Sequence, residues 1–359
     1  MSYNLAHRRV YAALRQREAT QPELARATGL SLPAVIEAVR QLEQRRLLEP
    51  VASQQGKGRP AKRVRLTPEW HLVLAFDFGG SSLRAALFDL HGGRLEQFEG
   101  MNMVRFSRLG LPDALRHLAE LVARFPQVER VGLCVPGVVW RDQVERSWVF
   151  GMKTLQKIQL EDALQKPVLL ENDARSAGWG EFRAGRGSQN FAFINFSFGI
   201  GAGIISDGRL LRGAHGAAGE MSYLPTHVSG FEEKKMGALS YGFFEALRAV
   251  STDPSQPNWE AKIFQNAAAG RDAEQRAVRL AVQHLALALA GIITALDPER
   301  IVLREEFPHT RELVLEPLRG LLAGIGLNTE LELSALGRDA GLIGAGLLAS
   351  EALERQLLR

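Results

Sequence analysis

The chain has 359 residues, of which 46% are hydrophobic and 23% charged, and its formal net charge is +4. This length accommodates two or three domains, and the composition is ordinary for a globular protein. The first residues lack an apolar signal segment, and the most apolar stretch, residues 285–296, is too short and Ala-rich to span a bilayer. We therefore expect a cytoplasmic protein with no membrane partner.

The positive charge is concentrated at the N-terminal end. Residues 1–70 hold 13 Lys/Arg and 6 Asp/Glu, a net of +7, whereas the other 289 residues hold 31 and 34, a net of −3. A basic segment joined to a slightly acidic remainder is typical of a phosphate-backbone binder. The single cysteine, Cys134, excludes an intrachain disulfide framework, and its apolar surroundings predict a buried core residue.

The first 70 residues have the pattern of a winged helix-turn-helix. Apolar spacing predicts helices over residues 5–17, 22–27 and 32–46, with Gly29 at the sharp turn and Ser31 as a helix N-cap. Strands are expected over residues 47–51 and 62–66, flanking a glycine-rich basic tip. The third helix is the predicted recognition helix. Its apolar stripe is expected to comprise Val35, Ile36, Val39 and Leu42.

The predicted recognition helix offers Ser31, Glu37 and Arg40 on its exposed face. Arg40 can contact guanine or phosphate, and Glu37 can accept a hydrogen bond from cytosine N4. The alternative is that Glu37 and Arg40 form a solvated surface pair.

The basic tip is the second predicted DNA contact. The sequence Gly58-Arg59-Pro60 predicts a narrow extended arm, which would suit an A·T-rich minor groove. We predict DNA contacts from Lys57, Arg59 and Arg63, the alternative being a solvated run of charges.

Beyond residue 70, strands alternate with helices, which predicts an α/β fold with a ligand cleft between two lobes. The predicted strands are residues 72–78, 83–89, 131–139, 167–170, 191–196, 202–206 and 300–303. The predicted helices are residues 111–125, 174–183, 271–296 and 341–354.

Five glycine-rich or polar motifs follow one another in this region. They are Asp77-Phe78-Gly79-Gly80-Ser81, Val135-Pro136-Gly137-Val138, Glu171-Asn172-Asp173-Ala174-Arg175, Gly199-Ile200-Gly201-Ala202-Gly203 and Gly213-Ala214-His215-Gly216-Ala217-Ala218-Gly219-Glu220. In this order they resemble the ROK family of bacterial sugar kinases and sugar-responsive repressors, from about residue 72 onward. With a helix-turn-helix in front, the layout is that of the repressor branch.

The resemblance implies an actin-like ATPase fold over residues 71–359. A smaller lobe is expected at about 71–175 plus the C-terminal helix, and a larger lobe at about 176–340. Sugar binds between the lobes in this family. The resemblance places Asp173 at the catalytic-base position of the kinases, with Asn172 and Glu220 as sugar contacts; a helix cap at Asn172-Asp173 is the compatible alternative.

Several departures from the family pattern argue against catalysis. Phe198 replaces the threonine that serves phosphate beside Gly199, and Arg304-Glu305-Glu306 replaces a glycine run that packs on adenosine. Asp77, Gly79 and Gly80 are kept, and we interpret them as a structural turn. We expect no nucleotide cofactor and no kinase activity, so that Asp173 is a remnant of the catalytic base.

The family's zinc site and its sugar contacts are altered as well. Tyr223 stands where the family has a histidine, and no cysteine follows Cys134, so no metal is expected; His227 is then a lone loop histidine. Trp148 falls near the usual asparagine contact. Trp148 and Tyr223 either stack on a sugar or fill the pocket.

These features predict a repressor that binds a pseudo-palindromic double-stranded DNA operator as a homodimer or tetramer and responds to a sugar or sugar derivative. Two alternatives remain open. One is an active sugar kinase with an accessory DNA-binding module, and the other is a regulator whose cleft answers to a protein partner.

Overall fold

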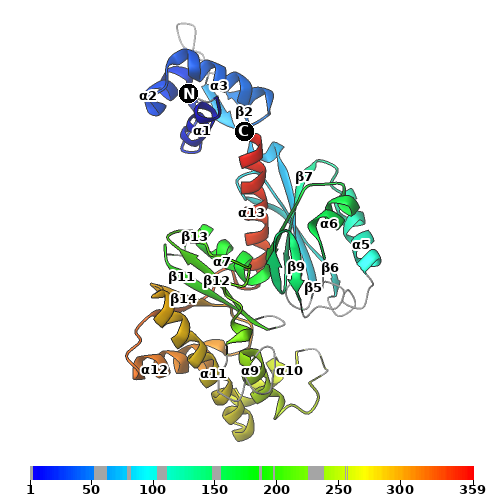
Figure 1. Cartoon of the computed structure of the whole chain (residues 1–359), viewed down its shortest axis with the longest axis vertical. Coiled ribbons are helices and arrows are strands. Elements are labelled where there is room, and N and C mark those ends of the chain that lie inside the picture. The colour runs from blue at the N-terminus through cyan, green and yellow to red at the C-terminus, as the bar shows by residue number, and fades with distance from the viewer. Residues whose placement is uncertain are drawn as a thin grey trace.

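The computed structural model describes residues 3–51, 63–78, 82–102, 111–147, 155–185, 188–196, 199–224, 238–254, 256 and 258–359. They form a small N-terminal module, residues 3–70, and a larger α/β body built on two sheets (Figure 1). The module lies at one end of the molecule, and the last helix runs from it into the body.

The N-terminal module consists of three helices and a small antiparallel sheet with strand order β1-β3-β2. Its helices are α1 (Tyr3–Leu14), α2 (Gln21–Thr28) and α3 (Leu32–Gln44). Its strands are β1 (Ala19–Thr20), β2 (Leu48–Val51) and β3 (Arg63–Leu66), followed by a short 3-10 turn, η1 (Pro68–Trp70). The elements match the predicted order, with β1 as an addition.

Local sequence explains where the module's helices begin. Thr20 caps α2 and forms a capping box with Glu23, while the Ser31 hydroxyl accepts from the backbone N–H of Ala34 at the start of α3. Gly29, between the two helices, has a φ of 67°, a conformation that glycine adopts without steric cost.

One predicted core residue of α3 is wrong. Ile36 is 44% exposed, and Ala38 takes the buried place instead. Residues 35, 38, 39 and 42 follow the i, i+3, i+4, i+7 spacing of one helix face, whereas residue 36 lies on the adjacent face. The exposed side of α3 is therefore more apolar than predicted.

The first sheet of the body has the strand order β10-β7-β4-β5-β6. Its strands are β4 (Leu72–Asp77), β5 (Ser82–Phe88), β6 (Arg94–Asn102), β7 (Val128–Val135) and β10 (Val168–Asn172). β4, β7 and β10 are parallel, while β5 and β6 are antiparallel to their neighbours. The predicted strand 131–139 is interrupted at Pro136–Gly137, after which β8 (Val138–Trp140) pairs with β9 (Gln143–Arg146).

The second sheet repeats this arrangement with the order β13-β12-β11-β14-β15. Its strands are β11 (Phe191–Phe196), β12 (Ile200–Ser206), β13 (Arg209–Leu210), β14 (Arg300–Leu303) and β15 (Glu330–Leu333). Again three strands form an antiparallel meander and two add in parallel on the other side. The body therefore contains two sheets of like topology.

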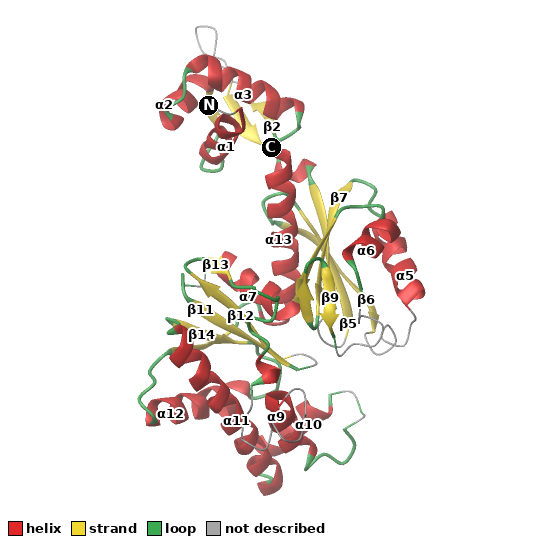
Figure 2. Cartoon of the chain, in the orientation of Figure 1, coloured by secondary structure: helices red, strands yellow, loops and turns green. Residues whose placement is uncertain are grey.

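Helices cover both faces of both sheets (Figure 2). α5 (Leu111–Ala123) and α6 (Lys157–Leu164) cover the outer face of the first sheet, and α13 (Ala340–Leu357) covers its inner face. α7 (Asp173–Arg183) covers the inner face of the second sheet. The outer face of that sheet packs on α9 (Ala238–Arg248), α10 (Trp259–Ala268), α11 (Asp272–Leu296) and α12 (Glu316–Gly324).

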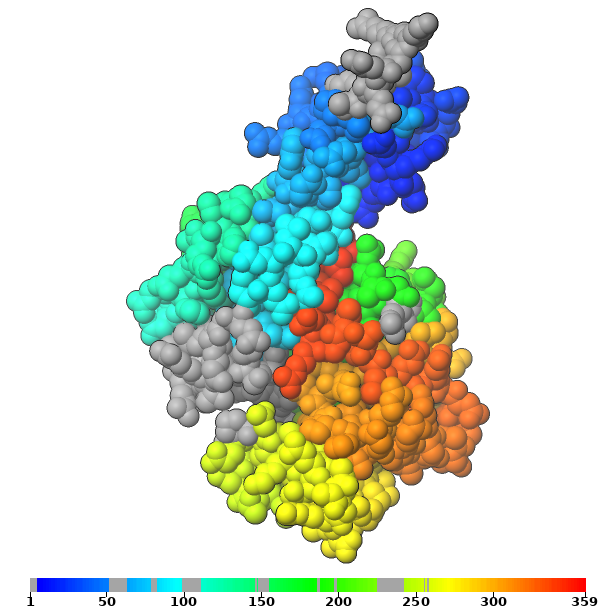
Figure 3. All heavy atoms as spheres, turned by 180° about the vertical axis from the view of Figure 1, so that it is seen from behind, coloured from blue at the N-terminus to red at the C-terminus, as the bar shows by residue number. Residues whose placement is uncertain are grey.

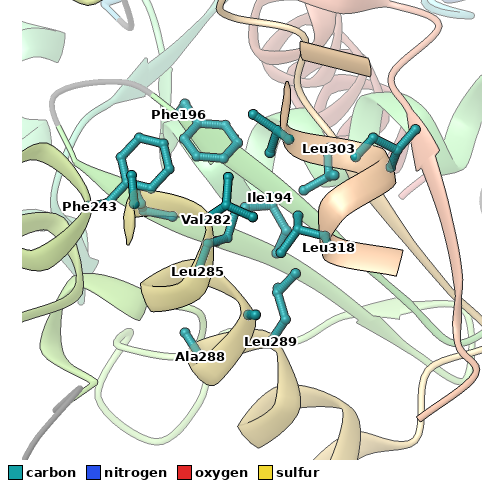
Figure 4. Packing of buried hydrophobic residues seen from close by; sticks show 14 of the residues in the cluster. Ile194, Phe196, Phe243, Val282, Leu285, Ala288, Leu289, Leu303 and Leu318 are labelled. Atoms are coloured by element: carbon teal, nitrogen blue, oxygen red, sulfur yellow. The ribbon is translucent and has the colours of Figure 1, made fainter. Parts of the chain in front are cut away.

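The largest apolar cluster lies under the second sheet. Figure 4 shows Phe196, Phe243 and Leu285 meeting there, from β11, α9 and α11. Among the described residues, α11 is the one helix long and apolar enough to cross a membrane, but half of its most apolar window is buried in this cluster. A core helix of a globular protein gives the same signal, and we interpret α11 as one.

The N-terminal module is attached to the C-terminal helix. Arg15, just after α1, forms an ion pair with Glu354 of α13, and the Arg45 guanidinium donates to the Leu357 carbonyl. Buried apolar residues of the module and of α13 belong to one continuous cluster, which also includes the inner face of the first sheet. In the space-filling view from behind, the blue module lies at one end and the orange-to-red C-terminal segment runs through the body (Figure 3).

α7 and α13 cross at very short range because glycines line their contact. A Cβ at Gly344 of α13 would lie 1.7 Å from the Ser176 carbonyl oxygen of α7, and one at Gly180 would lie 2.5 Å from the Ala340 carbonyl oxygen. Backbone atoms cannot yield as a flexible side chain can, so these positions accept no larger residue without separating the helices.

Gly344→Ala is expected to lower the free energy of unfolding by about 1–3 kcal/mol, because the added methyl group overpacks this crossing. Gly320→Ala is the matched control, since Gly320 lies exposed in α12 and a methyl group added there would meet no atom within 4 Å; it should gain up to about 1 kcal/mol from helix propensity. Urea unfolding measures both. Equal stability of the two variants would contradict the close contact.

Candidate functional site

A pocket opens between the two sheets, beside the carboxyl ends of β7, β10 and β11. It has about 380 Å³ of empty volume, open solvent included. Polar groups and glycine backbone dominate its wall. The described lining residues are Pro136, Gly137, Asn172, Asp173, Asn195, Gly199, Ile200, Gly201, Glu220 and Ser222. Carboxyl ends of parallel strands are where open α/β sheets bind ligands.

Asp173 is the first residue of α7 and is held by donors at both carboxylate oxygens. Oδ1 accepts from the Ala174 N–H at 2.9 Å and from Asn172 Nδ2 at 3.1 Å. Oδ2 accepts from Asn195 Nδ2 at 3.1 Å. The side chain is 7% exposed, so its direction into the pocket is fixed by these bonds.

The Asp173 carboxyl is electrostatically unusual. Burial raises its pKa to about 7, and the nearby Asp77 and Glu220 carboxylates raise it too, against the lowering effect of the Ala174 N–H and Arg304. Near neutral pH the Asp173 side chain is therefore divided between the carboxylate, which only accepts hydrogen bonds, and the protonated carboxyl group, which can also donate one. Perturbed carboxyl groups of this kind mark candidate functional sites.

Asn172 serves both as a helix cap and as part of the pocket wall. Its Oδ1 accepts from the Arg175 N–H at 2.9 Å, and its Nδ2 donates to the Gly137 carbonyl at 3.0 Å. The alternatives of cap and pocket residue are thus compatible, as the sequence allowed. Because Gly137 follows β7, this bond also joins the N-terminus of α7 to the first sheet.

The other predicted residues, the effector contacts and those of the two degenerate phosphate loops, are only partly brought together. Glu220 and Gly199 line the pocket with Asn172 and Asp173, but Tyr223 does not; Ser222 takes that place. The Ser222 hydroxyl accepts from the Ile200 N–H at 3.1 Å and donates to its carbonyl at 3.0 Å, which fixes the turn before β12. Trp148, Gly79, Gly80 and Phe198 lie outside the described residues.

The Asp77 carboxylate is already engaged by protein groups. It forms a buried ion pair with Arg84 of β5, and its Oδ1 accepts from the Cys134 thiol at 3.2 Å. Arg84 also binds Asp339 at 3.0 Å, at the start of α13. A guanidinium is thus paired with the Asp77 carboxylate, at the start of the first glycine-rich motif. Cys134 is buried, as predicted.

The segment after β14 folds into the protein. Of its two predicted carboxylates, Glu305 is exposed and Glu306 pairs with Arg304 at 2.9 Å. Arg304 itself is 6% exposed and donates to Asn195 Oδ1 at 3.0 Å. Phe307 stacks on Phe264 with ring centroids 4.6 Å apart. The segment that replaces the family's glycine run therefore turns an arginine inward, with one of its two glutamates beside that arginine as a counter-charge.

A second buried ion pair holds the loop between β13 and η2 (Met221–Tyr223) against the first sheet. Glu171, at the end of β10, binds Arg175 and Arg212, each at 2.7 Å. Burial alone would raise the pKa of Glu171, but the two guanidinium groups hold that pKa below its usual value. Arg175 also donates to the carbonyls of Gly216 and Val139, so it joins both parts of the body.

The described residues among the predicted DNA contacts, Ser31, Glu37, Arg40 and Arg63, lie in the N-terminal module. Glu37 and Arg40 form an exposed bidentate pair, with Nε–Oε2 and NH2–Oε1 distances of 2.9 and 2.6 Å. Arg63 of β3 pairs with Glu23 at 3.3 Å. Lys57 and Arg59 lie outside the described residues. In the absence of DNA, Glu37 and Arg40 therefore have the geometry of a solvated surface pair, which is the alternative to a DNA contact.

No group of three or more His, Cys, Asp or Glu side chains in the described ranges is arranged to hold a metal ion. His227 falls outside those ranges. Tyr223, at the family's histidine position, lies in η2.

The sequence did not assign Asn195, Ser222 or Arg84 to the site, and it marked Arg304 only as a departure from the family pattern. Asn195 is the single polar residue of the run Phe-Ala-Phe-Ile-Asn-Phe, which is a usable signal because a buried amide needs partners. The two arginines gave no such signal, since arginine at a strand end is usually exposed.

The duplicated sheets and the pocket between them define a two-lobed α/β protein of the sugar-kinase type. The sequence model described as the ROK family matches residues 73–352, and the chain belongs to the ROK family. The family predicted from the five motifs is thereby confirmed.

Relatives of this chain include both regulators and enzymes. The xylose repressor of Bacillus subtilis is 25% identical over 350 residues, covering 90% of this chain and 89% of the repressor. The bifunctional enzyme NanE/NanK of Brucella melitensis is 31% identical over 287 residues, covering 77% of this chain; the chain spans about half, 54%, of that enzyme's length. The full-length match supports the repressor branch.

A solved structure resembles the whole chain. The crystal structure of a ROK family transcriptional regulator, a homolog of the E. coli MLC protein, superposes with a TM-score of 0.78 at 21% identity. The match covers 99% of this chain and 98% of that one. At this identity the likeness shows the fold alone.

Asp173→Asn is expected to change how stability depends on pH. Because the folded-state pKa of about 7 lies above the unfolded value of 3.8, the native protein loses stability as the pH rises between these values. The loss amounts to at most about 4 kcal/mol, and the asparagine variant lacks it. Urea unfolding at pH 5 and pH 8 tests this; parallel profiles for the two proteins would contradict the raised pKa.

Proposed function

We propose that this chain is a sequence-specific DNA-binding transcriptional repressor controlled by a carbohydrate-like effector in the pocket between its two sheets. The observation that carries the proposal is the extent of the match to the xylose repressor. That match covers 90% of the chain, against 77% for NanE/NanK. The proposal places the protein in the cytoplasm, acting as a homodimer or tetramer on a pseudo-palindromic operator.

In this proposal the N-terminal module is a winged helix-turn-helix. α3 is its recognition helix, and β2 and β3 are the strands of its wing. The ion pair between Arg40 and Glu37 fixes the guanidinium on the exposed side of α3, from where it can turn to a phosphate or a guanine. Lys57, Arg59 and Arg63 of the wing add contacts to the backbone or minor groove.

The charges of the pocket favour an uncharged effector. Its described lining includes the carboxylates of Asp173 and Glu220 and no cationic side chain. Carboxylates and amides bind hydroxyl groups well, whereas a phosphate or a carboxylate on the ligand would meet like charge. We therefore propose a neutral sugar, with Asn172, Asp173 and Glu220 as its contacts.

Lack of kinase activity is also part of the proposal. Arg84 forms an ion pair with Asp77. Arg304 and Glu306 form a second pair, at the positions where the family has the glycine run that packs on adenosine. The alternative of an active kinase draws on the kinase relatives and on the retained Asp173, since N-acetylmannosamine kinases match 77% of the chain.

The wild-type chain is expected to bind a duplex from its own upstream region more tightly than a random duplex, as measured by fluorescence anisotropy over a series of salt concentrations. Arg59→Ala should weaken binding and reduce the salt slope by about 1, because one phosphate contact is lost. Arg116→Ala, an exposed arginine of α5 paired with Asp113, is the control and should change neither value. Equal affinity of the wild type for both duplexes would refute the DNA-binding proposal.

A thermal-shift screen of neutral sugars and their phosphates tests the effector. A neutral sugar at 100 times its Kd should stabilise the protein by about 2.7 kcal/mol, and Asp173→Asn should abolish the shift. Calorimetry with ATP and Mg²⁺ should show no binding. Clear ATP binding would favour the kinase alternative, and no shift with any sugar would favour a protein partner.

A further inference from the structure

Three consecutive contacts link the end of β14 to the pocket. Glu306 pairs with Arg304 at 2.9 Å, Arg304 NH1 donates to Asn195 Oδ1 at 3.0 Å, and Asn195 Nδ2 donates to Asp173 Oδ2 at 3.1 Å. Arg304, Asn195 and Asp173 are each less than 10% exposed. Asn195 and Asp173 line the pocket, whereas Arg304 lies behind them.

The guanidinium determines which way the Asn195 amide points. Arginine offers only donors, so the amide must turn its oxygen toward Arg304. The amide nitrogen then faces Asp173, which can accept. The two pocket groups are thereby set as a donor and an acceptor side by side, an arrangement that matches adjacent hydroxyl groups of a sugar.

We propose that Arg304 is a positioning residue for effector binding, which fixes the Asn195 amide and, through it, the Asp173 carboxyl in the orientation that receives the ligand. The proposal rests on the function proposed above and assigns a role to a residue that does not itself touch the ligand. It also accounts for the burial of the Arg304 guanidinium just after β14.

The charge of Arg304 supports this role. Arg304 opposes the rise in the pKa of Asp173 that burial, Asp77 and Glu220 produce. It therefore keeps more of Asp173 in the carboxylate form, which accepts from Asn195. Glu306 balances the arginine, so that no lone charge is buried.

The test compares sugar affinity in a set of variants by calorimetry, using the neutral sugar that stabilises the wild type. Arg304→Met is combined with Glu306→Gln, so that no unpaired carboxylate is left buried, and this pair should bind about tenfold more weakly or worse. Adding Asn195→Ala to this double variant should weaken sugar binding by less than about a further threefold, because Arg304 no longer holds the amide. Arg304→Lys, which keeps a charged donor, should recover part of the affinity.

The matched control is Arg300→Met with Glu332→Gln, an Arg–Glu pair at the other end of β14 with a 2.9 Å separation. It should bind like the wild type. Wild-type affinity in the Arg304→Met/Glu306→Gln protein would overturn the proposal. The proposal would also be overturned if Asn195→Ala weakened sugar binding as much in that double variant as it does in the wild type.

A ligand-free measurement separates this proposal from the proposed function. The pH midpoint of the Asp173-dependent change in stability should move upward in Arg304→Met/Glu306→Gln and stay unchanged in the control pair. If no sugar binds the wild type, the effector proposal fails, and the midpoint still decides whether Arg304 acts on Asp173. An unmoved midpoint would overturn the positioning role.

Discussion

The close crossing of α7 and α13 is the constraint on which the rest of the structure depends. Each helix covers the inner face of one sheet, so their contact sets the distance between the two sheets. Gly344 and Gly180 permit backbone atoms to meet there. α7 begins at Asp173 in the pocket, and α13 ends at the N-terminal module. The pocket and the module are therefore attached to the same pair of helices.

Three buried arginines of this region are each paired with a carboxylate. Arg84 joins Asp77 to Asp339, Arg175 joins Glu171 to the loop beside β8, and Arg304 joins Glu306 to Asn195. Buried pairs of this kind contribute little net stability, but breaking one leaves an uncompensated charge. Their value here is orientation: Arg84 joins β4 to the start of α13, Arg175 joins β10 to the loop that contains Gly216, and Arg304 joins the end of β14 to β11.

The sequence allowed the order of elements to be predicted because most strands are buried on both faces and are bounded by glycines and polar residues. It missed β6, an edge strand whose residues 94–97 are exposed and show no apolar alternation. It also gave no prediction for the short strands β9, β13 and β15 or for the helices α6, α9, α10 and α12. The pocket residues Asn172, Asp173 and Glu220 were found through motifs. Arg304 was noticed as a departure, but its inward direction depends on Asn195 and Glu306, which are neighbours only in the folded chain. Ile36 was misplaced because helix phase, not hydrophobicity, decides which side is buried.

The attachment of the module to α13 has a consequence for protein synthesis. The partners of Arg15 and Arg45 are Glu354 and Leu357, more than 300 positions later in the chain. The module emerges from the ribosome first, yet the helix on which it docks emerges after the whole body. During translation the N-terminal module is therefore tethered but undocked, and it can dock on α13 only after the body has been made.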